Sequence, residues 1–192
     1  MKRLIIIGAG GHGSVVADAA NVNCVFLDDD TSLPNVIGTP SSLNDILVEG
    51  DGVVVAIGDN VLRNEMLAAI DNAATVIHPT ACVSPKATLG QGSVVLANAV
   101  VNVGATLGRG CIVNTGATVD HDCVLGKSVH VSPGANLGGN VRVGDCSWIG
   151  IGAAVKHEVT IGKHVVVGAG AAVINDVPDN TTVVGVPARE TT

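Results

Sequence analysis

The sequence predicts a chain of two parts, a small α/β domain over residues 1–75 and a regular stack of short strands over residues 76–192. Three observations lead to this prediction. Aliphatic residues recur at every sixth position through the second part, whereas the first part alternates apolar strand-like runs with segments of helical periodicity. In addition, 47% of the residues are hydrophobic but only 1% are aromatic, which indicates an interior too narrow for rings.

The six-residue repeat runs from Ile77 to Val173 through seventeen units without an interruption. A helix has a period of about 3.6 residues and a half-buried strand a period of about 2, so neither produces this pattern. The fourth residue after each aliphatic is always small or β-branched, as at Ala99, Cys111 and Val141. We expect the repeats to stack so that their aliphatic side chains fill one narrow interior.

This pattern resembles the hexapeptide repeat of left-handed parallel β-helices. The resemblance implies that three repeats make one coil of a triangular prism, so that equivalent positions stack every eighteen residues. The left-handed coiling comes from the resemblance, because crossovers between parallel strands are ordinarily right-handed. The expected fold class is an α/β N-terminal mini-domain, a Rossmann-like half with a short parallel sheet, followed by a left-handed parallel β-helix of hexapeptide repeats.

The first part reads as a β-α-β-α-β-α unit, which forms a small parallel sheet. Strands are expected at Arg3–Ile7, Cys24–Leu27 and Val53–Ile57, and helices at Ser14–Ala20, from Ser41 or Ser42 to Val48, and at Val61–Ile70.

A glycine loop, Gly8–Gly13, follows the first strand and precedes the first helix, which is the context of a dinucleotide-binding fingerprint. Residues 1–75 make only half of a dinucleotide domain, so a mononucleotide half-site fits better than NAD. The backbone N–H groups of Gly10, Gly11 and His12 can hold a diphosphate at the helix start. A tight turn without a ligand is the alternative interpretation.

Two further features point to a ligand at the same sheet edge. Asp28 and Asp29 end the second strand, and either carboxylate can accept hydrogen bonds from a ribose or a base. Gly58 follows the third strand, where a ligand would also approach.

A candidate general base is His121, which lies between the carboxylates of Asp120 and Asp122. Acyl transfer needs a base for the nucleophile and hydrogen-bond donors for the developing oxyanion. Asp122 can orient the imidazole, as the third group of a triad does. Eighteen residues later stands Gly139, which leaves room for a substrate and offers its N–H as oxyanion donor. A solvated corner histidine without a catalytic role is the alternative.

Another histidine, His130, lies nine residues from His121, which is half a coil away on the perimeter. If both serve one site, they come from neighbouring subunits, and this predicts an oligomer.

Both halves of the chain together resemble the bacterial sugar O/N-acyltransferases. This family includes sialic acid O-acetyltransferases and N-acetyltransferases of UDP-4-amino-4,6-dideoxy-N-acetylglucosamine. The motifs that carry the resemblance are Gly8–Gly13, Leu27–Asp29, Ala56–Gly58, Asn114–Asp122, His130 and Gly185–Arg189.

The resemblance implies direct transfer of an acetyl group from acetyl-CoA to the 4-amino group of a UDP-linked amino sugar. It places Asn114 in the acceptor site and His130 near the thioester. It matches the main chain of Ile151 and Ala169 to the pantetheine arm of the cofactor and Arg189 to a phosphate at its nucleotide end. It also implies a homotrimer with sites between the prisms. Two other functions stay open, O-acetylation of sialic acid and a non-catalytic nucleotide-binding β-helix.

Composition argues against several other classes of function. A net charge of −7 does not fit a nucleic-acid partner, and no apolar run reaches the length of a membrane span. Histidine and cysteine spacings fit no zinc site. The five cysteines lack a C-x-x-C pair and are read as free thiols of a cytoplasmic protein, a catalytic cysteine being the other reading.

Overall fold

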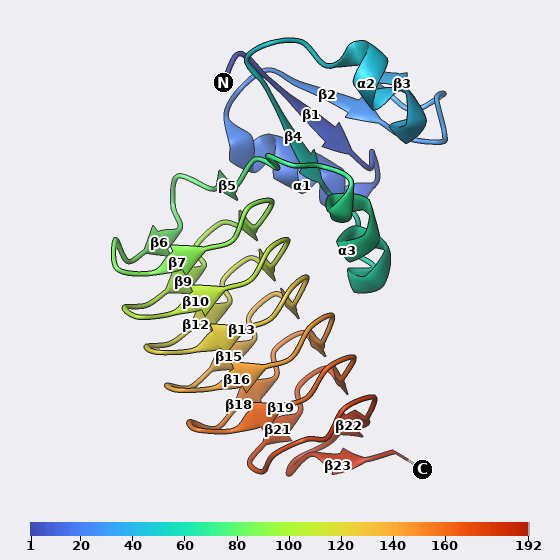
Figure 1. Ribbon diagram of the computed structural model, residues 1–192. Coiled ribbons are helices and arrows are strands. Elements are labelled where there is room, and N and C mark those ends of the chain that lie inside the picture. The colour runs from blue at the N-terminus through green and yellow to red at the C-terminus, as the bar shows by residue number, and fades with distance from the viewer. Residues whose placement is uncertain (192) are drawn as a thin grey trace.

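The structure, a computed structural model, describes residues 1–191 and consists of a small α/β domain followed by a long prism of short strands (Figure 1). The front domain sits at one end of the prism, and the chain then coils away from it toward the C-terminus. The expected fold class is confirmed: a short parallel sheet precedes a left-handed parallel β-helix.

The front domain holds one parallel sheet in the order β3-β2-β1-β4. Its central strand is covered on both faces, which is why Leu4 to Ile7 are a continuous buried aliphatic run. The elements are β1 (Arg3–Ile7), α1 (Gly11–Ala20), β2 (Cys24–Leu27), β3 (Val36–Gly38), the 3₁₀ helix η1 (Pro40–Ser42), α2 (Leu43–Ile46), β4 (Asp51–Val55) and α3 (Asn60–Ala68).

Several details differ from the sequence prediction, among them the ends of α2 and α3, which lie at Ile46 and Ala68 instead of Val48 and Ile70. The short edge strand β3 was not expected, because its three residues are only partly covered and show no clear alternation. Strand β4 lies two residues earlier than Val53–Ile57, since Asp51 pairs with Arg3 of β1. Helix α1 begins at Gly11, within the glycine loop, so the loop itself supplies the first turn.

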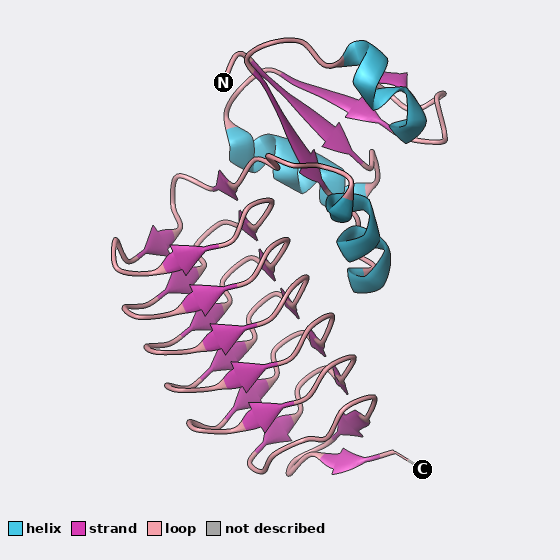
Figure 2. Ribbon diagram, viewed as in Figure 1, coloured by secondary structure: helices cyan, strands magenta, loops and turns pink. Residues whose placement is uncertain are grey.

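Seventeen two-residue strands, β5 to β21, form the three faces of the prism (Figure 2). They are β5 (Val76–Ile77), β6 (Cys82–Val83), β7 (Thr88–Leu89), β8 (Val94–Val95), β9 (Val100–Val101), β10 (Thr106–Leu107), β11 (Ile112–Val113), β12 (Thr118–Val119), β13 (Val124–Leu125), β14 (His130–Val131), β15 (Asn136–Leu137), β16 (Arg142–Val143), β17 (Trp148–Ile149), β18 (Ala154–Val155), β19 (Thr160–Ile161), β20 (Val166–Val167) and β21 (Ala172–Val173).

Each face consists of every third strand, paired in parallel, so that residues eighteen apart are neighbours, as for Leu107 and Leu125. The first face is made of β5, β8, β11, β14, β17 and β20, to which β22 (Thr182–Val184) and the antiparallel β23 (Arg189–Glu190) are added. The second face runs from β6 to β21, and the third from β7 to β19.

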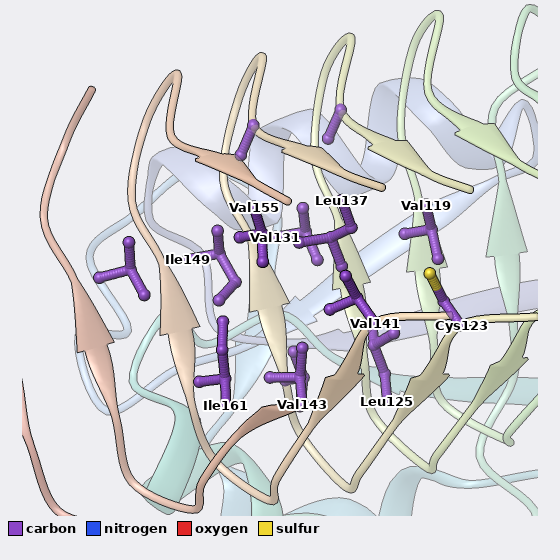
Figure 3. Packing of buried hydrophobic residues seen from close by; sticks show 14 of the residues in the cluster. Val119, Cys123, Leu125, Val131, Leu137, Val141, Val143, Ile149, Val155 and Ile161 are labelled. Carbon is purple, nitrogen blue, oxygen red and sulfur yellow. The ribbon is translucent and has the colours of Figure 1, made fainter. Parts of the chain in front are cut away.

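The interior of the prism is a single aliphatic column. Figure 3 shows Val119, Leu125, Val131 and Leu137 pointing inward from successive strands, and all are buried. Small residues such as Cys123 fill the corners between them, which explains the lack of aromatic rings.

The prediction that the aliphatic residue of each repeat fills the interior is wrong for the first repeat, because Ile77 is 45% exposed. No coil precedes Ile77, and the front domain packs against Val76 and Val94 on the outer side of the first face instead. The aliphatic column is therefore closed only from Val95 onward.

Helix α3 joins the two parts through the completely buried side chain of Arg63. Its Nε donates to the carbonyl of Gly110 at 2.9 Å, and Nη2 donates to the carbonyl of Ser128 at 2.8 Å. On the front-domain side, Nη1 donates to the carbonyl of Ile57 at 2.8 Å, and Nη2 also donates to Asn60 at 2.7 Å. Burial lowers the pKa of Arg63 to about 10, so the guanidinium stays charged at neutral pH.

Replacing this guanidinium should separate the two parts. We expect Arg63→Met to lower the free energy of unfolding by at least about 3 kcal/mol, since several buried carbonyls lose their donor at about 1–3 kcal/mol each. Denaturant unfolding measures the difference. Arg142→Met, at an exposed position of β16, is the control and should change the value by less than about 0.5 kcal/mol. Equal stability of the two variants would contradict the role of Arg63 in joining the front domain to the prism.

Candidate active site

A pocket of about 470 Å³ lies at the carboxyl ends of β1, β2 and β4, and we call it the glycine-loop pocket. Among the residues singled out from the sequence, six line it: Gly10, Gly11, His12, Asp28, Asp29 and Gly58. Helix α1 starts here without a side-chain cap, so its first N–H groups face the pocket without an intrahelical partner. Such a helix start attracts an anionic group.

The two aspartates of this pocket have different tasks. Asp28 accepts hydrogen bonds from the N–H of Ala9 at 2.7 Å and from the N–H of Asp30 at 3.0 Å. These bonds, that from Ala9 above all, lower the pKa of Asp28 and fix the glycine loop against β2. Asp29 is exposed and accepts no hydrogen bond from residues 1–191, so its carboxylate is the one available to a ligand.

A row of three rings connects this pocket with the prism. His12 stacks on His130 of β14 with ring centroids 6.5 Å apart, and His130 stacks on Trp148 of β17 at 6.1 Å. Burial lowers the pKa of His12 to about 4 and that of His130 to about 3, with the charge of Arg63 acting in the same direction. Both imidazoles are therefore neutral at neutral pH, and the buried Nε2 of His12 has no hydrogen-bond partner within residues 1–191.

Asn114 does not line the glycine-loop pocket but holds His130. Its Oδ1 accepts a hydrogen bond from the N–H of Thr115 at 2.8 Å, which leaves Nδ2 to donate to Nε2 of His130 at 3.1 Å. Since Nε2 is then an acceptor, the proton of the neutral ring lies on Nδ1. The sequence does not predict this bond, because the two residues occupy different positions in their repeats.

A second pocket, of about 540 Å³, lies on the first face beneath α3, and we call it the face pocket. It shares Gly58 with the glycine-loop pocket. Trp148 and His164 line it, and neither was among the site residues expected from the sequence. The signal that could have found Trp148 is its position directly before Ile149 in the repeat, which turns its side chain outward.

The His121–Asp122 pair lies at the corner between the second and third faces. Nδ1 of His121 is 2.9 Å from Oδ2 of Asp122, and this hydrogen bond raises the pKa of the histidine. Asp120 accepts a hydrogen bond from the N–H of His121 at 2.7 Å, which fixes the backbone of the corner. The imidazole lies directly against Gly139, where a Cβ would overlap Nε2, so the space expected there for a substrate is occupied by the His121 ring itself. The N–H of Gly139 donates to no group of residues 1–191.

The structure does not bring His121 and His130 together within one chain. His130 projects from the first face, whereas His121 occupies the corner opposite that face. A site that uses both residues therefore requires two copies of the chain.

Besides His130, the three other positions matched to the acyl donor lie around the first face. Ile151 and Ala169 stack at the corner between the first and second faces, where Gly170 donates to the carbonyl of Ile151 at 2.8 Å. Both side chains are exposed, and neither N–H donates to a group of residues 1–191, so both are free for an extended amide chain. Arg189 is exposed on β23, at the end of the same face.

Across residues 1–191, each helix is too short or too polar to cross a lipid bilayer. The same residues contain no group of three or more side chains that can hold a metal ion.

A left-handed prism of hexapeptide repeats with a nucleotide-type pocket in front defines a hexapeptide-repeat acyltransferase. Comparison with known proteins agrees with this class. Residues 3–70 match the family described as the PglD N-terminal domain. A stretch of 118 residues is 35% identical to UDP-N-acetylbacillosamine N-acetyltransferase of Bacillus subtilis, and it covers 50% of this chain and 52% of that relative.

Two solved structures are similar along nearly the whole chain. The acetyltransferase domain of PglB from Neisseria gonorrhoeae, in complex with acetyl coenzyme A, is 48% identical, with 99% of each chain covered and a TM-score of 0.94. PerB from Caulobacter crescentus, in complex with CoA and GDP-perosamine, is 38% identical, with 98% of this chain and 97% of that chain covered and a TM-score of 0.92. The chain belongs to the same family of acetyltransferases as these two proteins.

The part played by Asp28 in the glycine loop can be measured without a substrate. We expect Asp28→Asn to lower the free energy of unfolding at pH 7 by about 1.5–3 kcal/mol, the value of a hydrogen bond to a charged group. Because folding lowers the pKa of Asp28, the difference should shrink as the pH falls below the ordinary carboxyl value of 3.8.

Asp29→Asn is the matched control for this measurement, since the Asp29 carboxylate is exposed. Its stability should stay within about 0.5 kcal/mol of that of the unchanged protein. Equal losses for the two variants would show that Asp28 has no special part in the loop.

Proposed function

We propose that this protein transfers the acetyl group of acetyl-CoA to the 4-amino group of a UDP-linked amino-deoxy sugar. The observation that carries the proposal is the glycine-loop pocket, which offers a helix start for a diphosphate and the free carboxylate of Asp29. Full-length similarity to structures that hold acetyl coenzyme A, or CoA with GDP-perosamine, supports the same donor and the same class of acceptor.

The acceptor is bound by the front domain, residues 1–75. Its diphosphate contacts the N–H groups of Gly10, Gly11 and His12, and its ribose or base donates to Asp29. Gly58 leaves open space beside the ligand, since a Cβ there would contact nothing within 4 Å. This arrangement presents the sugar amine at the first face of the prism, next to His130.

His121 accepts the proton of the attacking amine, and Asp122 orients its ring. The amine nitrogen forms a bond to the thioester carbonyl carbon, and the oxyanion that develops accepts a hydrogen bond from the N–H of Gly139. The carbon–sulfur bond then breaks, and CoA leaves as the thiol with the proton that His121 received. No covalent intermediate with the protein is required.

The acetyl-CoA pantetheine runs along the corner formed by Ile151 and Ala169, whose free N–H groups suit its amide carbonyls, and Arg189 contacts a phosphate. His121 reaches this donor only from a neighbouring chain, because it lies opposite the first face. The proposal therefore includes a site shared by two chains, and the resemblance to hexapeptide-repeat acyltransferases extends it to a homotrimer with its sites between prisms. It places the enzyme in the cytoplasm, which agrees with five cysteines that are all free.

The test is release of CoA thiol from acetyl-CoA in the presence of different acceptors. We expect turnover with UDP-4-amino-4,6-dideoxy-N-acetylglucosamine and much less with GDP-perosamine or sialic acid. Preference for GDP-perosamine would change the assigned nucleotide, and turnover only with sialic acid would overturn N-acetylation. Absence of turnover with every acceptor would contradict the proposed reaction.

Removing the proposed base has a defined expected effect. His121→Ala should lower kcat by roughly 10²–10⁴-fold, the usual contribution of a positioned general base. His157→Ala is a matched control, because His157 is an exposed residue two coils further along the same corner. Unchanged turnover in His121→Ala would remove His121 from the mechanism.

The hydrogen bond from Asp122 also predicts the pH dependence. A base acts only when neutral, so kcat/KM should fall as the pH drops through the pKa of His121, which lies above its ordinary value of 6.5. Asp122→Asn removes the main cause of that increase, and the acidic limb of the profile should move to lower pH. An acidic limb at the same pH in both proteins would argue against this assignment.

A further inference from the structure

From Gly92 to Gly170, every sixth residue has a positive φ, and these residues stack along the corners. At the corner of the candidate base, Gly104 has φ +75° and Asp122, one coil further on, has φ +58°. The N–H of Asp122 donates to the carbonyl of Val103 at 3.0 Å, so the two turns are in direct contact.

The backbone conformation does not by itself require glycine at these positions. Asn98, Ser128 and Cys146 occupy equivalent positions with φ between +52° and +58°. Some other property of the site therefore accounts for glycine at position 104.

That property is space for the Asp122 side chain. A Cβ on Gly104 would overlap Oδ1 of Asp122 far inside van der Waals contact. The other oxygen of the same carboxylate, Oδ2, is the one 2.9 Å from Nδ1 of His121. Any displacement of Oδ1 therefore rotates Oδ2 away from the imidazole.

We propose that Gly104 is a positioning residue, whose missing side chain lets the Asp122 carboxylate turn toward His121. The pair is held between two glycines of the same corner, with Gly104 beneath the carboxylate and Gly139 against the ring. The effect on turnover rests on the proposed function, whereas the effect on the titration of His121 does not.

Gly116 provides a matched control for this inference. Its φ of +64° is similar to that of Gly104, but a Cβ there would meet nothing within 4 Å. Alanine at either position carries similar backbone strain, so Gly116→Ala shows how much Tm falls from that strain alone. Only Gly104→Ala should displace Asp122.

The experiment is titration of His121 by NMR in the purified full chain, together with kcat for each variant. We expect Gly104→Ala to lower the pKa of His121 toward its ordinary value and to lower kcat at least about 10-fold, part of the contribution of a positioned base. Gly116→Ala should leave the titration unchanged. In an Asp122→Asn background, Gly104→Ala should cause no further shift, because it acts only through that carboxylate.

An unshifted His121 titration in Gly104→Ala would overturn the inference, and so would a further shift in the Asp122→Asn background. A shifted titration combined with full turnover in His121→Ala would instead contradict the proposed function and leave the positioning role intact.

Discussion

The stacking of residues eighteen apart is the constraint on which the rest of this structure depends. In strands β5 to β18, the N–H of the first residue donates to a carbonyl of the next coil, as between Val94 and Cys111 at 2.8 Å. With strands of two residues, a shift by a single residue would turn each aliphatic outward, so the register is fixed by the interior. The corner residues follow the same register, so the candidate site residues lie at fixed positions along the prism axis. That is how His121, Gly139 and Gly104 come to share one corner.

The front domain depends on this framework through one buried cation. Arg63 donates to carbonyls at two successive levels of the same corner, Gly110 and Ser128, and to the carbonyl of Ile57, two residues after β4. The contact brings the glycine loop over the first face, where His12 meets His130. The glycine-loop pocket and the first face are thereby joined within one chain, while the candidate base His121 lies on the opposite corner. This separation is the physical reason why we propose a site shared between subunits.

The sequence predicted those features that follow from a period or from a local motif. The six-residue repeat gave all seventeen prism strands, and the glycine loop gave the residues of one pocket. Contacts between distant side chains were not predicted, because they do not follow from the six-residue period. These are the contacts of Arg63 with the prism corner, of Asn114 with His130, and of the stacked rings with Trp148. The predicted burial of Ile77 was wrong for another reason, since a repeat pattern does not show whether its first unit is covered by other residues. The role given to Asp28 shows a further limit, because a carboxylate beside a loop serves a backbone N–H or a ligand equally well in sequence terms.

The central claim is that each active site uses His121 of one chain and His130 of another. Its most direct test is co-expression of His121→Ala and His130→Ala chains with different affinity tags, followed by purification on both tags in turn. In a closed trimer that contains both variants, one interface keeps both histidines, so turnover should recover to about one third of the unchanged enzyme. Doubly purified assemblies that are no more active than either parent, or a failure to obtain any mixed assembly, would contradict the account.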